Sequence, residues 1–173
     1  MKELIARDLF PILTVMGQVG LLGVALASLN SVYKKSIEKF IKSNGLVTGF
    51  GVALVATLGS LFYSEVMGYN PCLLCWYQRI AMYPLVLLLG LAAYKKDNGM
   101  ADYGFWLSVV GGVIALYHYL LQMGLLPSLI CLTSGGCVTR FVFQYGYVTI
   151  PMMALTAFVI IAVLMNWVRR IEK

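Results

Sequence analysis

The sequence predicts an all-α integral membrane protein. Hydrophobic residues make up 61% of the chain and charged residues only 12%, and the mean hydropathy is +0.85. Soluble domains are about 45–50% apolar, so a soluble domain of this length could not bury so much apolar surface, and the bilayer must solvate part of it. Lys and Arg fall in short clusters between apolar runs. This pattern is typical of membrane topology and excludes nucleic-acid binding as the meaning of the +6 net charge.

Five apolar segments are each near the roughly 20 residues that a helix needs to cross about 30 Å of hydrocarbon. The third is interrupted only by Arg79, and short connections join the segments, so we expect one domain. Gly45 and Gly49 form a small-xxx-small pattern that favours close helix packing. In chain order the predicted spans are Leu9–Tyr33, Ser43–Ser64, Trp76–Tyr94, Tyr103–Leu125 and Phe141–Val168.

The distribution of Lys and Arg orients these helices. If the five spans alternate in direction, nine basic residues share one face and four share the other. Cytoplasmic segments carry the basic excess, so the lysine-rich face is predicted to be cytoplasmic and both cysteine pairs to lie together outside. The larger set is Lys34, Lys35, Lys39, Lys42, Lys95, Lys96, Arg169, Arg170 and Lys173, and the smaller set is Lys2, Arg7, Arg79 and Arg140.

The first apolar segment admits a second interpretation. Residues 25–28 read Ala-Leu-Ala-Ser, which resembles a small-residue signal-peptidase site after an apolar run. Cleavage there would leave four lysines on the outer face. We therefore favour a retained helix whose N-terminus lies outside.

All four cysteines occur as two pairs on the predicted outer face, where disulfides form and persist. In the loop-entropy account a Cys72–Cys75 bridge stabilises by only about 2 kcal/mol, whereas a Cys72–Cys137 bridge would give about 4 kcal/mol. A disulfide within a Cys-x-x-Cys pair therefore adds little stability, and the pair is more typical of a redox centre. A structural membrane protein stapled by disulfides or by zinc is the less favoured alternative. Five residues separate Cys131 from Cys137, and outward thiolates are readily oxidised.

The Cys-x-x-Cys pair is predicted to open a helix. Asn70 suits the N-cap and Pro71 the first helical position, which would place Cys72 and Cys75 three apart on one face of the first turns. Amides at a helix N-terminus favour a thiolate, and Arg79 adds a positive charge one turn deeper. We therefore expect a lowered thiol pKa and a sulfur ready for exchange.

Arg79 and His118 have similar predicted depths in the third and fourth spans. Ionisable groups in spanning helices are costly and often mark function. The alternatives are that Arg79 snorkels to the interface and that His118 is an interhelical hydrogen-bonding residue. Trp76 and Tyr77 suggest that the dithiol lies at the membrane–water boundary. Glu65 is a candidate to neutralise Arg79.

Electrons from these thiols need an acceptor. The sequence has no haem Cys-x-x-Cys-His motif, no flavin or nicotinamide glycine fingerprint and no metal-cluster motif. A two-electron acceptor dissolved in the bilayer meets the need. Quinone is the favoured cofactor, because Arg79 and His118 could stabilise negative charge on its carbonyl oxygens.

Residues 55–97, with Cys-x-x-Cys-Trp-Tyr-Gln-Arg at 72–79, resemble the DsbB/BdbC-type membrane disulfide oxidoreductases. Residues 117–122 (YHYLLQ), the prolyl loop with two cysteines and residues 146–155 (GYVTIPMMAL) resemble the same family. The resemblance implies a four-transmembrane-helix bundle over roughly 45–168, holding ubiquinone or menaquinone, with one additional N-terminal helix. It leaves residues 1–44 as an extension with an extra transmembrane helix and a lysine-rich cytoplasmic loop, and 169–173 as a basic cytoplasmic tail.

The family also implies roles. A secreted thioredoxin-fold thiol oxidase (DsbA/BdbD-type) would pass electrons to the loop pair, supporting disulfide formation in proteins exported across the cell membrane. Cys131 would face this partner, and Cys137 would bridge to Cys72 in transit. Cys75 would face the quinone. The implied catalytic residues are Cys72, Cys75, Cys131 and Cys137, and the implied quinone-binding residues are Arg79 and His118.

Two features depart from the family pattern. The chain up to Asn44 lies outside its core, and the loop Leu-Thr-Ser-Gly-Gly at 132–136 is short, as in BdbC-like members, which favours a BdbD-type partner. A vitamin-K-epoxide-reductase-like quinone reductase is the alternative enzyme, since it shares the bundle and two cysteine pairs. It places its Cys-x-x-Cys after the loop cysteines, and the order here is the reverse.

Overall fold

The computed structural model describes residues 8–127, 131 and 136–172. Five helices within this part of the chain are long and apolar enough to cross a membrane, which confirms the predicted all-α membrane class. Among the residues used above, Lys2, Arg7, Lys173 and loop positions 132–135 lie outside the described residues. The helices are α2 (Phe10–Ser28), α3 (Ser31–Leu61), α4 (Leu73–Lys95), α5 (Ala101–Gln122) and α6 (Ile150–Glu172), with a short π-helix η2 (Phe62–Val66) after α3 and a short 3-10 helix η3 (Asn98–Met100) before α5.

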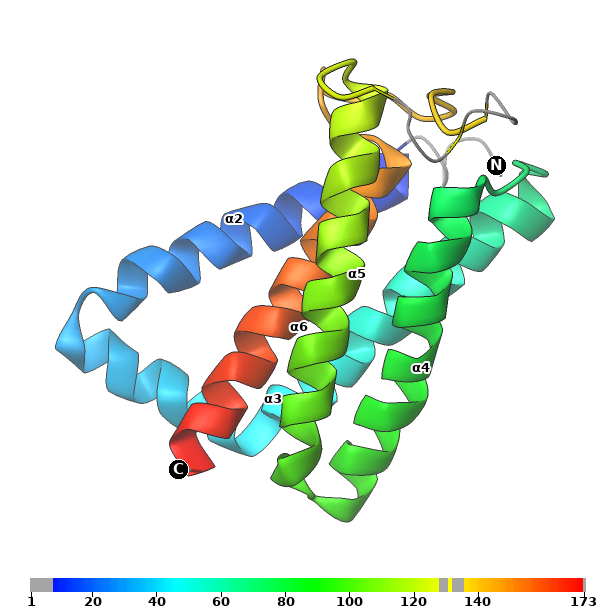
Figure 1. The fold of residues 1–173 in the computed structure, drawn as a ribbon. Coiled ribbons are helices and arrows are strands. Elements are labelled where there is room, and N and C mark those ends of the chain that lie inside the picture. Colours follow the sequence, from blue (N-terminus) through cyan, green and yellow to red (C-terminus); the bar gives the residue numbers. More distant parts are fainter. Residues whose placement is uncertain (1–7, 128–130, 132–135, 173) are drawn as a thin grey trace.

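Helices α3 to α6 form a bundle, and α2 lies outside it (Figure 1). Within the bundle α5 packs on α4 and α6, and α3 packs on the same two helices. Helix α2 contacts α3 and α6, and it diverges from α6 toward its own C-terminal end. The four cysteines lie at one end of the bundle, here called the cysteine end, and the opposite end is called the basic end.

Small residues allow the helices of the bundle to approach closely. A Cβ atom on Gly111 of α5 would lie 2.3 Å from the ring of Phe158, so only glycine lets α5 pack on α6 at this point. A Cβ on Gly45 or Gly49 would lie 2.6 or 2.8 Å from side-chain atoms of α6. The small-xxx-small prediction for this pair is therefore confirmed, and its packing partner is α6.

Helix α3 begins earlier than the predicted second span. It starts at Ser31, where Asn30 accepts a hydrogen bond from the Val32 amide at 3.0 Å. The lysines between residues 34 and 42 thus lie on a helix, and the expectation of a lysine-rich loop is wrong. Lysine has a good helix propensity, and Lys34 pairs with Glu38 one turn on at 3.9 Å. The boundary expected near residue 44 falls inside one continuous helix.

The predicted last span also differs from the structure at its start. Helix α6 begins at Ile150, nine residues after the expected start at Phe141. The intervening residues form a turn closed by the Gln144–Val148 bridge, with Tyr145 and Gly146 at φ 53° and 77°. These residues carry no charge, so hydropathy alone could not separate an apolar interfacial turn from the helix that follows.

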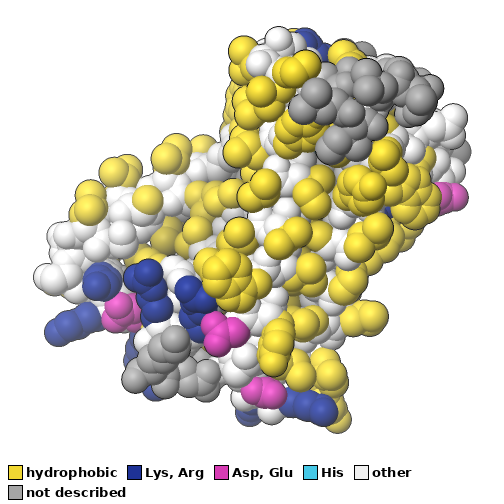
Figure 2. Space-filling view, in the orientation of Figure 1, with side chains coloured by type: hydrophobic (Ala, Val, Ile, Leu, Met, Phe, Trp, Pro, Cys, Tyr) yellow, Lys and Arg dark blue, Asp and Glu magenta, His cyan; other side chains and the backbone are white. Residues whose placement is uncertain are grey.

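Charge is distributed unequally between the two ends. Figure 2 shows Lys and Arg side chains gathered at the basic end, where α4 and α6 terminate. There Arg169 of α6 pairs with Asp102 of α5 at 3.3 Å and lies over the Phe105 ring at 3.9 Å. The basic end is the end that the positive-inside rule predicts to be cytoplasmic.

Candidate active site

The first cysteine pair lies at the start of α4. Cys72 is the N-cap, with extended backbone (φ −73°, ψ 172°), and its sulfur accepts a hydrogen bond from the Cys75 amide at 3.4 Å. The expected N-cap at Asn70 and helical start at Pro71 are therefore wrong by two residues, because the extended segment continues through Cys72 and its sulfur takes the cap role. The two sulfurs are free thiols 2.9 Å apart. We call this pair the α4 dithiol.

The Cys72 sulfur lies just before the membrane-spanning part of α4. The hydrogen bond with the Cys75 thiol lowers the pKa of Cys72 from its ordinary 9.0 to about 4, opposed by burial and assisted by the hydrogen bond with His118. The amide of Cys75, at a helix N-terminus, acts in the same direction as His118. This environment favours the thiolate form of Cys72, which is both the better nucleophile and the better leaving group.

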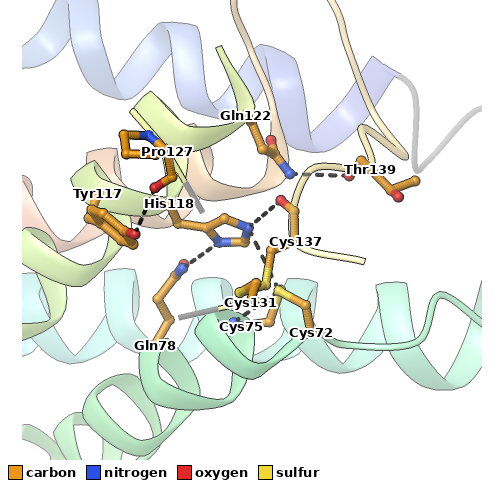
Figure 3. Close-up of a disulfide and its surroundings, with 10 residues drawn as sticks. All are labelled: Cys72, Cys75, Gln78, Tyr117, His118, Gln122, Pro127, Cys131, Cys137 and Thr139. Carbon is orange, nitrogen blue, oxygen red and sulfur yellow. Dashed lines mark hydrogen bonds between the residues drawn. A yellow bond between two sulfur atoms is a disulfide. The ribbon is translucent and has the colours of Figure 1, made fainter. Parts of the chain in front are cut away.

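His118 of α5 lies beside the cysteines, contacts one residue of each pair and is 1% exposed (Figure 3). Its Nε2 is 3.1 Å from the Cys137 carbonyl oxygen and 3.7 Å from the Cys72 sulfur, and its Nδ1 is 2.9 Å from the Gln78 side-chain nitrogen. A carbonyl oxygen only accepts, so Nε2 carries the proton of the neutral ring and Nδ1 accepts from Gln78. His118 therefore donates toward Cys72 and stabilises its thiolate. The interhelical role also holds, because Gln78 belongs to α4.

Arg79 is buried near the cysteine end, with 9% of its surface exposed. Its Nε and Nη2 donate to the hydroxyl and the carbonyl oxygen of Ser60 on α3, each at 3.0 Å, and its guanidinium lies 5.4 Å from the Trp76 ring centroid. Arg79 is held between helices, which a purely snorkelling side chain would not be. Glu65 accepts from the Ser64 hydroxyl at 3.0 Å and forms no ion pair with Arg79, so that expectation is wrong.

The second cysteine pair, Cys131 and Cys137, forms a disulfide, here called the loop disulfide. Both residues are buried, at 6% and 0% exposure. They pack in one cluster with Leu74 of α4 and Leu121 of α5, and Cys72 packs against that cluster. The structure thus brings all four predicted cysteines together.

Arg140 and Gln122 fix the chain that follows the loop disulfide. The Arg140 guanidinium donates through Nε, at 2.8 Å, and through Nη2 to the Gln122 carbonyl oxygen at the end of α5. The Gln122 side-chain nitrogen in turn donates to the Thr139 carbonyl oxygen at 3.2 Å. These bonds tie the segment after Cys137 to the helix that carries His118.

Two cavities meet at Cys75 and Arg79. The smaller, about 60 Å³, is lined by Cys72, Cys75 and His118 as well as Arg79. The larger, about 510 Å³, lies between α2, α3, α4 and α6 and falls in the range of about 300–1,000 Å³ usual for ligand pockets. Cys75, Gln78 and Arg79 line the larger cavity, and Cys72 and His118 do not. Cys75 therefore lines both the small cavity that contains Cys72 and the larger, mostly apolar cavity.

A metal could also be considered for the α4 dithiol. The sulfurs of Cys72 and Cys75 and a ring nitrogen of His118 lie within 4.8 Å of one another, and these donor types suit zinc. The sulfurs, however, are only 2.9 Å apart. Two sulfurs each about 2.3 Å from a tetrahedral zinc ion lie farther apart than this.

Gln78 and Ser60 were missed by the sequence analysis. Gln78 fixes the His118 ring, and Ser60 holds the Arg79 guanidinium. Gln78 lies three residues after Cys75, on the same helix face and inside the Cys-x-x-Cys-Trp-Tyr-Gln-Arg motif, so an amide in an apolar helix was the available signal. Ser60 carries no comparable signal, since small hydroxyl residues are common in spanning helices.

Comparison with known proteins decides the family. The family model described as "Disulfide bond formation protein DsbB" matches residues 42–169. The chain belongs to the DsbB family. "Disulfide bond formation protein C" of Bacillus subtilis (strain 168) is 41% identical over 125 residues, covering 69% of this chain and 88% of that protein. No solved structure matches the chain.

Two further relatives are also described as probable disulfide formation proteins. "Probable disulfide formation protein C 1" of Bacillus anthracis is 46% identical over 120 residues, covering 68% of this chain and 86% of that protein. "Probable disulfide formation protein" of Metapseudomonas resinovorans is 42% identical over 130 residues, covering 73% and 90%.

DsbB-family membership makes this chain a multi-pass membrane protein and a disulfide-forming oxidoreductase, which confirms the predicted resemblance. It also sets aside the vitamin-K-epoxide-reductase-like alternative and the structural membrane protein. The match begins at residue 42, inside α3, so α2 lies outside the part that the family model covers.

Proposed function

We propose that this DsbB-family protein reoxidises a secreted thioredoxin-fold thiol oxidase of the DsbA/BdbD type and passes the electrons to membrane quinone. This activity would support disulfide formation in exported proteins, with the cysteine end on the extracytoplasmic side of the cell membrane. The position of Cys75 carries the proposal, because that sulfur lines both the small cavity shared with Cys72 and the large apolar cavity.

The exchange begins at the loop disulfide. A thiolate of the reduced partner attacks Cys131 and breaks the Cys131–Cys137 bond. The second partner thiol then displaces Cys131, so the partner leaves as a disulfide and the loop pair holds two electrons and two protons. Cys137 is completely buried and its carbonyl oxygen lies 3.1 Å from His118 Nε2, which supports its role as the inner sulfur.

The loop pair then reduces the Cys72–Cys75 disulfide. Cys137 attacks Cys72 and releases Cys75, and Cys131 attacks Cys137 and releases Cys72. The loop disulfide is restored, and the α4 pair now carries the two electrons and two protons. This product has the redox state seen in the structure, with Cys131 and Cys137 bridged and Cys72 and Cys75 as thiols.

The low pKa of Cys72 favours this direction of transfer. A dithiol whose reduced form is stabilised is a stronger oxidant when it is a disulfide, as in DsbA. The Cys75 thiol, the Cys75 amide and His118 all stabilise the Cys72 thiolate. The two electrons are therefore held preferentially by the α4 dithiol, beside the larger cavity.

The larger cavity suits a quinone by its chemistry. Its walls are mostly apolar, while Arg79 and Gln78 supply hydrogen-bond donors where Cys75 faces the cavity. Ser60 accepts two guanidinium N–H groups of Arg79, which leaves three of its five donors for a ligand oxygen. Bound quinone would supply the two-electron oxidation that restores the Cys72–Cys75 disulfide, leaving as quinol with two protons. Arg79 would orient a carbonyl oxygen, and the apolar walls would exclude water.

An anaerobic thiol titration tests the proposal. The purified, reduced protein is mixed with ubiquinone or menaquinone, and free thiols and quinone absorbance are followed together. We expect two thiols to disappear for each quinone reduced, and no quinone reduction in the Cys75→Ser variant. A parent protein whose thiol count does not change when quinone is added would contradict quinone as the acceptor.

A further inference from the structure

Helix α2 forms part of the larger cavity although it lies outside the DsbB match. Phe10, Leu13, Thr14 and Gly17 of α2 line the cavity that Cys75 of α4 also lines. The remaining lining residues come from α3, α4, the start of α6 and η2. Without α2 this side of the cavity would open directly to lipid.

Polar contacts hold α2 against the bundle at mid-helix. The Gln18 side-chain nitrogen donates to the Thr156 hydroxyl of α6 at 3.0 Å, and the Tyr147 hydroxyl donates to the Gln18 side-chain oxygen at 2.8 Å. A glutamine amide in a membrane helix needs such partners, because lipid offers none. Gln18 is thus a specific attachment point between α2, α6 and the turn before α6.

Aromatic contacts fix the same helix at the cysteine end. The Phe10 ring lies 5.6 Å from the ring of Phe62 and 5.4 Å from the ring of Tyr63, between centroids. A Cβ on Gly59 of α3 would meet the Phe10 ring at 3.0 Å, so α2 and α3 pack closely there. The first half of α2 is therefore a fixed wall.

The second half of α2 is separated from the bundle. A Cβ on Gly17 would lie 3.0 Å from Ile160 of α6, whereas a Cβ on Gly20 or Gly23 would meet nothing within 4 Å. Figure 1 shows α2 diverging from α6 over this stretch. The wall is closed near the cysteines and opens toward the middle of the membrane.

We propose that α2 closes the lipid-facing side of the quinone cavity and contacts the prenyl tail of a tailed quinone. The quinone enters where the second half of α2 diverges from α6. This inference rests on the proposed function. The occupant follows from the lining: Arg79, Gln78 and Cys75 suit a polar redox headgroup, and the apolar wall from Thr48 to Val55 of α3 suits a hydrocarbon tail. Tailed quinones are then favoured over tail-less ones.

Photolabelling of the full chain in lipid nanodiscs tests this inference. The probe is a prenylated quinone with a diazirine on its tail, and labelled peptides are mapped by mass spectrometry. We expect labelling on residues 10–17 that excess tailed quinone suppresses. Labelling confined to α3 and α4 would overturn the role of α2 and leave quinone use intact. Equal labelling by a diazirine phospholipid that quinone does not displace would assign the cavity to acyl chains and overturn the proposal.

Matched variants of α2 give a second readout by equilibrium dialysis. Gly17→Leu fills the closed part of the wall, and we expect about tenfold weaker binding of tailed quinone, equivalent to about 1.4 kcal/mol. Gly20→Leu changes the same helix where nothing is within 4 Å and should bind like the parent. Gly20→Leu should also reduce quinone at the parent rate, which checks that the chain folds with a leucine in α2. Equal weakening of tailed-quinone binding by the two variants would overturn the proposal. The same conclusion would follow if Gly17→Leu weakened the binding of tailed and tail-less quinone equally. Failure of the parent to bind or reduce any quinone would instead overturn the proposed function.

Discussion

The two cysteine pairs lie against each other but owe their chemistry to different levels of structure. The α4 dithiol occupies a helix N-terminus, where the Cys72 sulfur caps the helix and faces Cys75 at 2.9 Å. The two cysteines of the loop disulfide belong to no helix. They pack against Leu74 and Leu121, and the bond from Arg140 to Gln122 holds the segment that follows them. Local sequence therefore brings the first pair together at a helix start, to which His118 of α5 adds one contact, and tertiary packing sets the position of the second pair.

This difference separates two functions. In the proposed function, the α4 dithiol, which lies beside the larger cavity, transfers electrons to a lipid-soluble acceptor. The loop disulfide, which packs in one cluster with Cys72, exchanges with Cys72 and with the protein partner. His118 is common to both, since its Nε2 faces the Cys72 sulfur and the Cys137 carbonyl oxygen.

Serine substitution should separate the two pairs most strongly. Cys72→Ser or Cys75→Ser should abolish quinone reduction by the reduced partner, because the remaining α4 sulfur cannot form its disulfide. Cys131→Ser combined with Cys137→Ser should abolish turnover with the partner, yet its chemically reduced α4 dithiol should still be oxidised by quinone in a single turnover. Stopped-flow absorbance of quinone measures both. Normal turnover in any single α4 variant would contradict the division of roles.

Arg79→Met should affect only the α4 side of the comparison. Loss of charged hydrogen bonds worth about 1.5–3 kcal/mol corresponds to roughly a tenfold to hundredfold rise in the KM for quinone. Thiol exchange between the partner and the loop pair should be unchanged, because the guanidinium of Arg79 bonds to Ser60 and lies over the Trp76 ring. Steady-state kinetics with varied quinone, and quenched exchange with varied partner, measure the two steps. Unchanged quinone kinetics would remove Arg79 from the cavity function.

The pH dependence of alkylation tests the Cys72 environment. Because its pKa is lowered to about 4, Cys72 should react with iodoacetamide at a nearly constant rate from pH 8 down to pH 6 and slow only as the pH falls toward 4. Gln78→Leu should move this midpoint upward, since the His118 ring then loses its Nδ1 partner. Tyr77→Phe, at an exposed neighbouring position, is the control. A parent midpoint near 9 would show that the helix start and His118 do not stabilise the thiolate.

The smallest effect is expected at the loop anchor. Arg140→Met removes the bonds to the Gln122 carbonyl oxygen, and because Arg140 is exposed, a stabilisation of only about 1 kcal/mol should be lost. Exchange with the partner should slow a few-fold, while quinone oxidation of the α4 dithiol stays at the parent rate. A larger effect on the quinone step than on the partner step would reverse the proposed assignment.

Much of the fold and of the site could be predicted because the signals are local. Long apolar runs identify the spans, and Gly45 and Gly49 identify a packing face. The Cys-x-x-Cys spacing places Cys72 and Cys75 together without knowledge of the rest of the chain. The prediction was wrong where a local signal admitted two interpretations. The lysines at the start of α3 suit a loop or a helix, and the uncharged segment before α6 suits a helix or a turn.

Tertiary contacts could not be predicted in the same way. The pairing of Arg79 with Ser60 and of His118 with Gln78 depends on how α3, α4 and α5 rotate against one another, and a single sequence does not record those rotations. The placement of α2 against the larger cavity is of the same kind, since it depends on Gln18 finding Thr156 far along the chain.

A disulfide-trapping experiment measures most directly whether the α4 dithiol and the loop disulfide are coupled. With Cys75 and Cys131 both changed to Ser, the remaining Cys72 and Cys137 should form a disulfide on mild oxidation, visible as two thiols lost and one cross-linked peptide. With Cys72 and Cys137 changed instead, Cys75 and Cys131 should remain thiols. Failure of the first variant to cross-link, or equal cross-linking in both, would contradict the exchange route through Cys72 and Cys137.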